Sequence, residues 1–464
     1  MSDGPLILWF RRDLRLADHP MLTAAVQAGR AVVPVVILDP QTEAQGAAAL
    51  WRWGLAVAAF DKALAALGVR LTLRRGAALT VLRGLVAETG ASGVWWTRLY
   101  DPVSRERDEA VKTALLADGV EARSFAGHLL HEPWEVQTGE GGFYKVFTPF
   151  WRAVRQLPVR DVLPTPTALR AGPLVPGDDL AEWHLERRMQ RGAAIVLPFQ
   201  HVGEAAAQAR LAAFLDDRLA QYAEGRDYLA RDASSGLSEN LTYGEISPVQ
   251  IWHEGWRALQ DGAAGAETFL KELVWREFAW ALTFHTPQLT TTHWREAWND
   301  FPWRADNADA EAWRRGMTGE PVVDAAMRQM FVTGTMHNRA RMIAASYLTK
   351  HLLTDWRVGQ AWFAKCLTDW DPASNALGWQ WVAGSGPDAA PYFRIFNPAT
   401  QGEKFDPDGR YRARWLNPAS PDAKAFFDAV PRAWALAPSP YPQRLIALDQ
   451  GRARALDALA QRKA

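Results

Sequence analysis

The chain has 464 residues, of which 48% are hydrophobic and 22% charged, and this is an ordinary globular composition. Lys plus Arg and Asp plus Glu both number 52, so the net charge is zero and a basic surface for a polyanion must be local. The single cysteine, Cys366, excludes an intrachain disulfide framework and a cysteine-rich metal site, and we expect no metal ion. The N-terminus lacks a signal-peptide pattern and no stretch has the length of a membrane span, which predicts a cytoplasmic protein without membrane contact.

The first 127 residues alternate short apolar segments with alanine- and leucine-rich helical ones. Strands are expected at 6–10, 32–38, 71–75, 93–99 and 122–125. This alternation predicts an α/β domain with a doubly wound parallel sheet. No GxGxxG follows the first strand, where WFRRDLRLADHP stands instead, and this argues against a dinucleotide site of the Rossmann type.

The remainder of the chain divides into two parts. Residues 128–205 are rich in Pro, Gly and mixed polar residues, which predicts a connector running over the surface. From 206 to 464 helical periodicity dominates, with start and stop signals every ten to twenty residues, which predicts an all-α domain. Fifteen of the 23 tryptophans lie from Trp252 onward, and filling of the core between helices explains most of them.

The stretch DWDPASNALGWQW, 369–381, carries an unusual concentration of functional side chains. Asp371 before a proline indicates the start of a helix. On that helix Asp371, Asn375 and Trp379 form one stripe, while Trp381 is rotated by about 200° from Trp379. An acid, an amide and an indole on one stripe suit a flat polar ligand; the alternative is a helix cap with one core and one stray tryptophan.

Two other helices repeat this combination of a polar group with a flat or soft apolar partner. Asn338 and Met342 are four residues apart, and Glu272 and Trp275 are three apart, with Arg276 available to pair with Glu272. Three such helices indicate a shared polar cavity with aromatic walls. The turn SSGLS, 234–238, could wrap phosphates through its backbone N–H groups, although serine-rich turns are common.

Taken together, these residues resemble the DNA photolyase and cryptochrome flavoproteins. The resemblance spans nearly the whole chain, from WFRRDLRLADHP through FYKVFTPFW to WQWVAGSGPDAAPYFRIFNPATQGEKFDPDG. It implies an N-terminal α/β domain and a C-terminal helical domain that binds FAD. The positions that match the cofactor site are Tyr222, Ser234, Ser235, Gly236, Leu237, Ser238, Arg341, Asp369, Trp370, Asp371 and Asn375.

Within this set the resemblance implies particular roles. Tyr222 and the turn 234–238 would hold the diphosphate and ribityl chain, and Asp369 with Arg341 would form an ion pair beside the isoalloxazine. Asn375 would face the reactive flavin nitrogen, where an amide favours repair over signalling. Trp379, Trp356 and Trp303 match the chain that passes electrons from the surface to photoexcited oxidised flavin.

The resemblance also implies the substrate. Glu272, Trp275, Asn338, Met342 and Trp381 match the pocket for a cyclobutane pyrimidine dimer, and enzymes for the (6-4) lesion carry histidines where Asn338 and Met342 stand. An apolar wedge and hydrogen bonds to the base edges suit two fused, flipped pyrimidines. The contacts expected to hold phosphates are Arg226, Arg339, Arg394 and Gln401. Glu272, Asn338 and Asn375 are the expected catalytic residues.

One departure concerns the antenna chromophore. Ser104 stands where many bacterial members carry an acidic folate contact. Methenyltetrahydrofolate bound in another way is the first expectation, and a deazaflavin or no antenna are the alternatives.

The resulting hypothesis is a deoxyribodipyrimidine photolyase, a monomer in which reduced FAD, excited by blue light, donates one electron to a dimer in UV-damaged DNA. The alternative from another class is a cryptochrome-like photosensor with a protein partner, which the lack of a long tail after Trp434 disfavours. A light-independent flavin oxidoreductase has no nicotinamide motif to support it.

Overall fold

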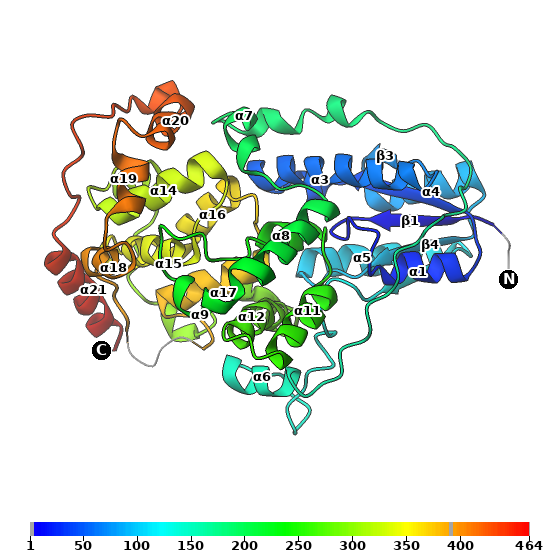
Figure 1. Ribbon diagram of the computed structural model, residues 1–464, viewed down its shortest axis with the longest axis horizontal. Coiled ribbons are helices and arrows are strands. Elements are labelled where there is room, and N and C mark those ends of the chain that lie inside the picture. Colours follow the sequence, from blue (N-terminus) through cyan, green and yellow to red (C-terminus); the bar gives the residue numbers. More distant parts are fainter. Residues whose placement is uncertain (1–3, 389–392, 464) are drawn as a thin grey trace.

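The computed structural model describes residues 4–388 and 393–463. Residues 389–392, part of the long C-terminal motif of the resemblance, lie outside this description. An α/β domain and a larger helical domain lie side by side (Figure 1).

The α/β domain is built on a five-stranded parallel sheet in the order β3-β2-β1-β4-β5. The strands are β1 (Leu6–Phe10), β2 (Val32–Leu38), β3 (Thr72–Arg75), β4 (Gly93–Thr97) and β5 (Glu121–Phe125). All five expected strands are present, with ends that differ by at most two residues, and the predicted fold class is confirmed.

The sheet is buried on both faces, which explains why its central strands are almost continuously apolar. The helices of this domain are α1 (Pro20–Gln27), α2 (Pro40–Glu43), α3 (Ala47–Ala66), α4 (Ala78–Thr89) and α5 (Pro102–Ala117). Leu6, Leu8 and Phe10 of β1 pack with α1 and α3, whereas Ile7 and Trp9 pack with α4 and α5.

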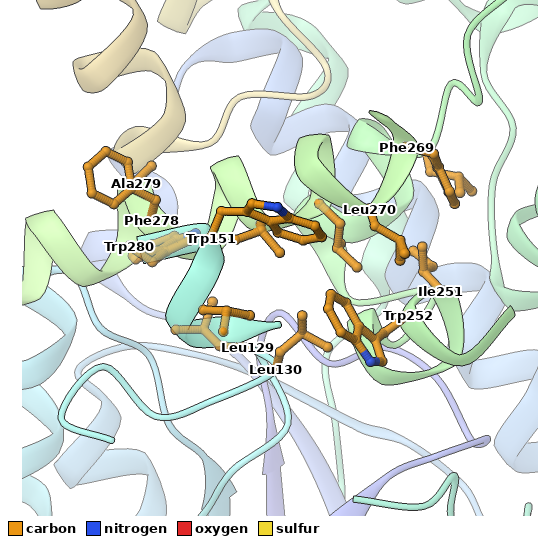
Figure 2. Packing of buried hydrophobic residues seen from close by; sticks show 14 of the residues in the cluster. Leu129, Leu130, Trp151, Ile251, Trp252, Phe269, Leu270, Phe278, Ala279 and Trp280 are labelled. Atoms are coloured by element: carbon orange, nitrogen blue, oxygen red, sulfur yellow. The ribbon is translucent and has the colours of Figure 1, made fainter. Parts of the chain in front are cut away.

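The segment 128–205 is not only a surface connector, and the sequence-based description of it was wrong in part. Its helix α6 (Phe147–Val154) buries Phe150 and Trp151 against α11 (Pro248–Gln260) and α12 (Ala266–His285) of the helical domain (Figure 2). The Trp151 ring lies 6.3 Å from that of Trp252 on α11. The rest of the segment follows the outer edge of the sheet, where Gly172 N–H donates to Val32 O (2.9 Å), and contains near its end the short helix α7 (Ala193–Val196) (Figure 1).

The second domain is helical throughout its described residues, as predicted, and contains no named strand. Its helices are α8 (Glu204–Asp217), α9 (Tyr222–Gly225), α10 (Ser238–Tyr243), α11 (Pro248–Gln260), α12 (Ala266–His285), α13 (Ala308–Arg314), α14 (Pro321–Thr333), α15 (Asn338–Ser346), α16 (Trp356–Cys366), α17 (Pro372–Ala383), α18 (Pro398–Phe405), α19 (Arg410–Leu416), α20 (Pro421–Ala429) and α21 (Leu448–Lys463). A π-helix, Tyr347–His351, continues α15.

Helix α17 lies between the two largest hydrophobic clusters of this domain. Ala373 and Leu377 belong to the cluster around α11 and α12, whereas Trp379 and Val382 belong to the cluster around α14, α15 and α16. Burial on opposite sides removes the usual division into an apolar and a polar face. The stretch 369–381 therefore enters the centre of the domain and is not a surface helix.

A buried ion cluster joins the two domains. Arg52 of α3 donates to Glu239 of α10 (2.6 Å) and to Glu245 (2.7 Å), and all three side chains are buried. Burial by itself would lower the pKa of Arg52, but the two carboxylates raise it overall. Because α10 begins at Ser238, this cluster fixes the helix that follows the SSGLS turn.

Candidate active site

Asp369 lies at the centre of a small network formed by three segments of the helical domain. Its Oδ2 accepts hydrogen bonds from Ser238 Oγ (2.8 Å) and from Arg341 Nη2 (2.7 Å). Arg341 is held in turn by Met336 O, to which its Nε donates at 2.8 Å. The expected pairing of Asp369 with Arg341 is therefore present in the structure.

The other oxygen of Asp369 makes no such hydrogen bond to the residues described. Asp369 is only 5% exposed, yet Oδ1 is buried and has no hydrogen-bond partner within the described residues. A buried carboxylate oxygen without a donor is costly. A ligand with an N–H or O–H group at this point would satisfy it, so the residues present fit a polar, flat cofactor such as FAD.

The remaining residues expected to hold the cofactor surround this centre with different degrees of exposure. Gly236 has a φ of +67°, which gives the SSGLS turn its left-handed bend, and Leu237 is buried under the turn. Ser234 is exposed, Ser235 is half-buried, and Trp370 is half-buried at the edge of the α14–α16 cluster. Tyr222 is buried, and this burial raises its pKa, so its hydroxyl stays protonated.

Asn375 lies one turn after Asp371 on α17. Its Nδ2 donates to Asp371 O at 3.0 Å. This bond uses one N–H of the amide, so the amide oxygen and the second N–H remain for a ligand.

The ion pair expected for Glu272 was assigned to the wrong arginine. Glu272 pairs with Arg226 of the α9 turn, whereas Arg276 donates to His128 O (3.0 Å) and contacts Glu277 (3.2 Å). Glu272 and Arg276 are four residues apart on α12, but they do not pair because Arg276 points toward the buried residue His128 of the segment 128–205. Burial opposes the charge of Arg226, but Glu272 outweighs it and raises the pKa of the guanidinium.

The aromatic residues expected at the substrate pocket come from different clusters. Trp275 is half-buried and stacks on Phe147 of α6, with ring centroids 3.7 Å apart and planes at 5°. Trp381 is half-buried at the end of α17, with the guanidinium of Arg394 5.6 Å from its ring. The motif FYKVFTPFW contains Phe147, but its packing against Trp275 could not be read from the sequence.

The polar residues expected at this pocket lie at the start of α15 and around α18. Asn338 is exposed, and Met342, one turn later, is half-buried. Arg339 pairs with Asp227 at 2.7 Å and lies over the Phe405 ring at 4.4 Å. Gln401 is half-buried on α18.

Of the three tryptophans expected to carry electrons, two are buried and one is half-buried. Trp379 (3% exposed) packs against Gly359 of α16, where a Cβ would collide with the indole. Trp356 begins α16 and is fully buried, whereas Trp303 is half-buried. Sequence reasoning missed His293, which lies between Trp356 and Trp303 with ring centroids 6.0 Å from each.

Among the residues described, no group of three or more His, Cys, Asp or Glu side chains is arranged to hold a metal ion. No helix in the described ranges combines the length and the apolar character that a bilayer crossing requires.

Comparison with known proteins agrees with this architecture. Residues 6–168 match the family described as DNA photolyase, and residues 269–461 match the FAD binding domain of DNA photolyase. A deoxyribodipyrimidine photo-lyase of Agrobacterium fabrum is 44% identical, covering 99% of this chain and 98% of that protein. A class III photolyase from Agrobacterium tumefaciens has a crystal structure that aligns with a TM-score of 0.91 at 44% identity, over 100% of this chain and 98% of that one.

Cryptochromes are also similar, at greater distance. Cryptochrome-1 of Arabidopsis thaliana is 33% identical over 99% of this chain and 71% of its own length. The fold and site thus define a protein of the flavin-binding photolyase type. The chain belongs to the DNA photolyase family.

Proposed function

We propose that the protein is a light-driven lyase that repairs cyclobutane pyrimidine dimers in DNA. The observation that carries the proposal is the Asp369 centre, a buried carboxylate with one oxygen bound by Arg341 and Ser238 and the other without a partner. It occurs in a chain 44% identical, over almost its whole length, to a deoxyribodipyrimidine photo-lyase.

FAD would lie with its ring system against Asp369 and Arg341, its ribityl and diphosphate groups against Tyr222 and residues 234–238, and Trp370, Asp371 and Asn375 along one wall. When bound and reduced, it supplies a one-electron donor that blue light excites. Asp369 Oδ1 would accept a hydrogen bond from the ring, and Asn375 would present its amide oxygen. The protein contributes placement, electrostatics and exclusion of water.

The flipped dimer would enter between Trp275 and Trp381, with Met342 completing the apolar wedge. Glu272 and Asn338 would bind the carbonyl and imino edges of the two bases. Because Arg226 holds Glu272 as an ion pair, the carboxylate is an acceptor for imino N–H groups. Glu272 would also stabilise the radical anion of the dimer through these hydrogen bonds.

Phosphates on either side of the lesion would be held by Arg226, Arg339, Arg394 and Gln401. In the structure Arg226 pairs with Glu272 and Arg339 pairs with Asp227. A DNA phosphate would either replace these carboxylates or bind to the arginines in addition to them. This binding of phosphates would be independent of the DNA sequence and would weaken steeply with salt.

The protein would act on DNA as a monomer, and its single cysteine suits a reducing, cytoplasmic location.

For photoreduction of oxidised flavin, electrons would pass from Trp303 through Trp356 to Trp379. Trp303 is half-buried whereas Trp356 and Trp379 are buried, which supports Trp303 as the outermost member, since that member must exchange electrons with solutes. Methenyltetrahydrofolate remains the first proposal for an antenna, with a deazaflavin or none as alternatives. An absorption spectrum of the purified protein distinguishes the three.

The decisive experiment concerns the type of lesion. Asn338 and Met342 cannot donate a proton, and the resemblance assigns the (6-4) reaction to a histidine donor at these positions. The reduced protein is irradiated with oligonucleotides carrying either lesion, and the products are separated by chromatography. We expect restored thymines from the cyclobutane dimer only; restored (6-4) thymines refute the pocket assignment, and no light-dependent repair of either lesion favours the photosensor.

A further inference from the structure

His293 connects the two outer tryptophans of the proposed electron chain. Trp356 Nε1–H donates to His293 Nδ1 at 3.2 Å, and the two rings lie nearly perpendicular at 69°. On its other side the imidazole is almost parallel to Trp303, at an interplanar angle of 10°. The imidazole therefore contacts both indoles.

The surroundings of His293 fix its protonation state. Because Nδ1 accepts the hydrogen bond, the proton of the neutral ring is on Nε2. His293 is 5% exposed, and Nε2 has no partner within the described residues. Burial lowers the pKa of His293 most, Asp355 raises it and Arg357 lowers it, so the ring is neutral at pH 7.

Trp356 has no contact with solvent to which it could lose a proton, since its side chain is fully buried. Oxidation of an indole makes its N–H a much stronger acid, and among the residues described the acceptor of this N–H is His293 Nδ1. A hydrogen bond to a basic nitrogen also stabilises the oxidised indole relative to the neutral one.

We propose that His293 is the positioning residue and proton acceptor of the tryptophan chain, a role that rests on the proposed photoreduction. Trp356 gives one electron to oxidised Trp379, and its Nε1 proton moves to His293 Nδ1. The products are a neutral Trp356 radical and an imidazolium ion. When Trp303 in turn gives an electron to Trp356, the proton returns from Nδ1 to Nε1, so charge and protons balance at each step.

The test uses the FAD-containing protein and three variants. His293→Phe keeps an aromatic ring between the indoles but removes the acceptor. His293→Gln keeps an acceptor oxygen that is too weak a base to take the proton. Trp356→Phe interrupts the chain itself.

Two measurements are made. In the dark, the indole ¹H–¹⁵N resonance of Trp356 reports its hydrogen bond without any photochemistry. Under light, with an external thiol donor, the loss of visible flavin absorbance gives the photoreduction rate, and transient absorption distinguishes the protonated from the neutral tryptophan radical.

We expect a neutral Trp356 radical in the wild type. In His293→Phe the Trp356 resonance moves and the radical stays protonated. Photoreduction slows about five-fold, which is the rate change expected when one hydrogen bond is lost. In His293→Gln most of the rate returns while the radical stays protonated, which a purely structural role of His293 does not predict.

If both His293 variants show the same radical spectra and photoreduction rates as the wild type, the proposal is overturned. An unmoved Trp356 resonance in His293→Phe overturns it as well, and this readout remains if the variant binds FAD poorly. If Trp356→Phe does not slow photoreduction, the chain and the role of His293 both fall. Absence of dimer repair by the reduced wild type refutes the proposed function alone, because the His293 measurements contain no DNA.

Discussion

Trp280 donates its indole N–H to Asp371 Oδ2 at 3.0 Å, and this bond joins the start of α17 to the middle of α12. The other oxygen of Asp371 accepts the Ser374 N–H at 2.7 Å, as a helix N-cap does. Both oxygens of Asp371 are therefore used within the protein, whereas Asp369 keeps one oxygen without a partner. Of the two acids in the DWD sequence, Asp371 positions the helix and Asp369 is available to a ligand.

This difference predicts different phenotypes for substitutions of Asp369 and of Asp371. Asp369→Ala should purify with little FAD, because Arg341 is left without its carboxylate. Asp371→Ala should lose about 2 to 4 kcal/mol of stability from the lost cap and the unsatisfied Trp280 N–H. Flavin content per protein and urea denaturation measure the two effects. Full flavin content in Asp369→Ala would contradict the cofactor assignment.

Trp381→Ala should weaken binding of a dimer-containing oligonucleotide by about 1 to 3 kcal/mol, the range for one base stacked on an aromatic side chain, with FAD retained. Trp256→Ala is the matched control, since Trp256 is also half-buried but stacks on Trp252 of α11. Titration of the labelled oligonucleotide measures both. Equal losses in the two variants would remove Trp381 from the pocket.

Glu272→Ala should have two effects of opposite sign, because it removes a lesion contact and releases Arg226. Repair yield per photon should fall, while binding to undamaged DNA should tighten and depend more strongly on salt. Fluorescence anisotropy at several salt concentrations, with dimer-containing and undamaged oligonucleotides, measures the second effect. Weaker binding to undamaged DNA would mean that Arg226 needs Glu272 to stay in place.

Trp356→Phe should block photoreduction of oxidised FAD by an external donor, because phenylalanine keeps the packing of α16 but is far harder to oxidise. Chemically reduced protein should still repair dimers, since that reaction starts from reduced FAD. The absorbance of the flavin under blue light and the repair assay are followed in parallel. If the chemically reduced variant cannot repair, Trp356 has a structural role.

Glu277 should make stability fall as the pH rises. Burial raises the pKa of Glu277 to about 7, against about 4.3 for an unfolded glutamate. The folded state therefore holds an extra proton between these values, and the stability that this proton contributes, about 4 kcal/mol, is present below pH 4.3 and lost as the pH rises to 7.

Glu277→Gln keeps an acceptor for the Leu130 N–H, which donates to Glu277 at 2.8 Å, and cannot titrate. Compared with that of the wild type, the free energy of unfolding of the Gln variant should be higher at pH 8 than at pH 5. Urea midpoints at the two pH values measure this. A constant difference would show that Arg276 keeps Glu277 ionised throughout.

The helices and strands of this protein follow from local properties of its chain. The apolar runs that became β1, β2 and β4 are buried on both faces, so local composition and tertiary environment agree there, and the start of α17 follows from Asp371 before a proline. Trp379 and Trp381 are two residues apart on a helix, so their divergence is fixed by helix geometry.

Only the tertiary structure decided which partner each polar side chain has. Glu272 pairs with Arg226, 46 positions earlier, and not with Arg276 on its own helix, because α9 packs against α12 and α6 covers the other side. Asp369 and Asp371 have the same chemistry and differ only in what α10, α15 and α12 bring to them. His293 meets Trp356 through a contact across 63 residues. Helical periodicity and caps are local properties of the chain, whereas these pairings depend on how segments distant in sequence pack together.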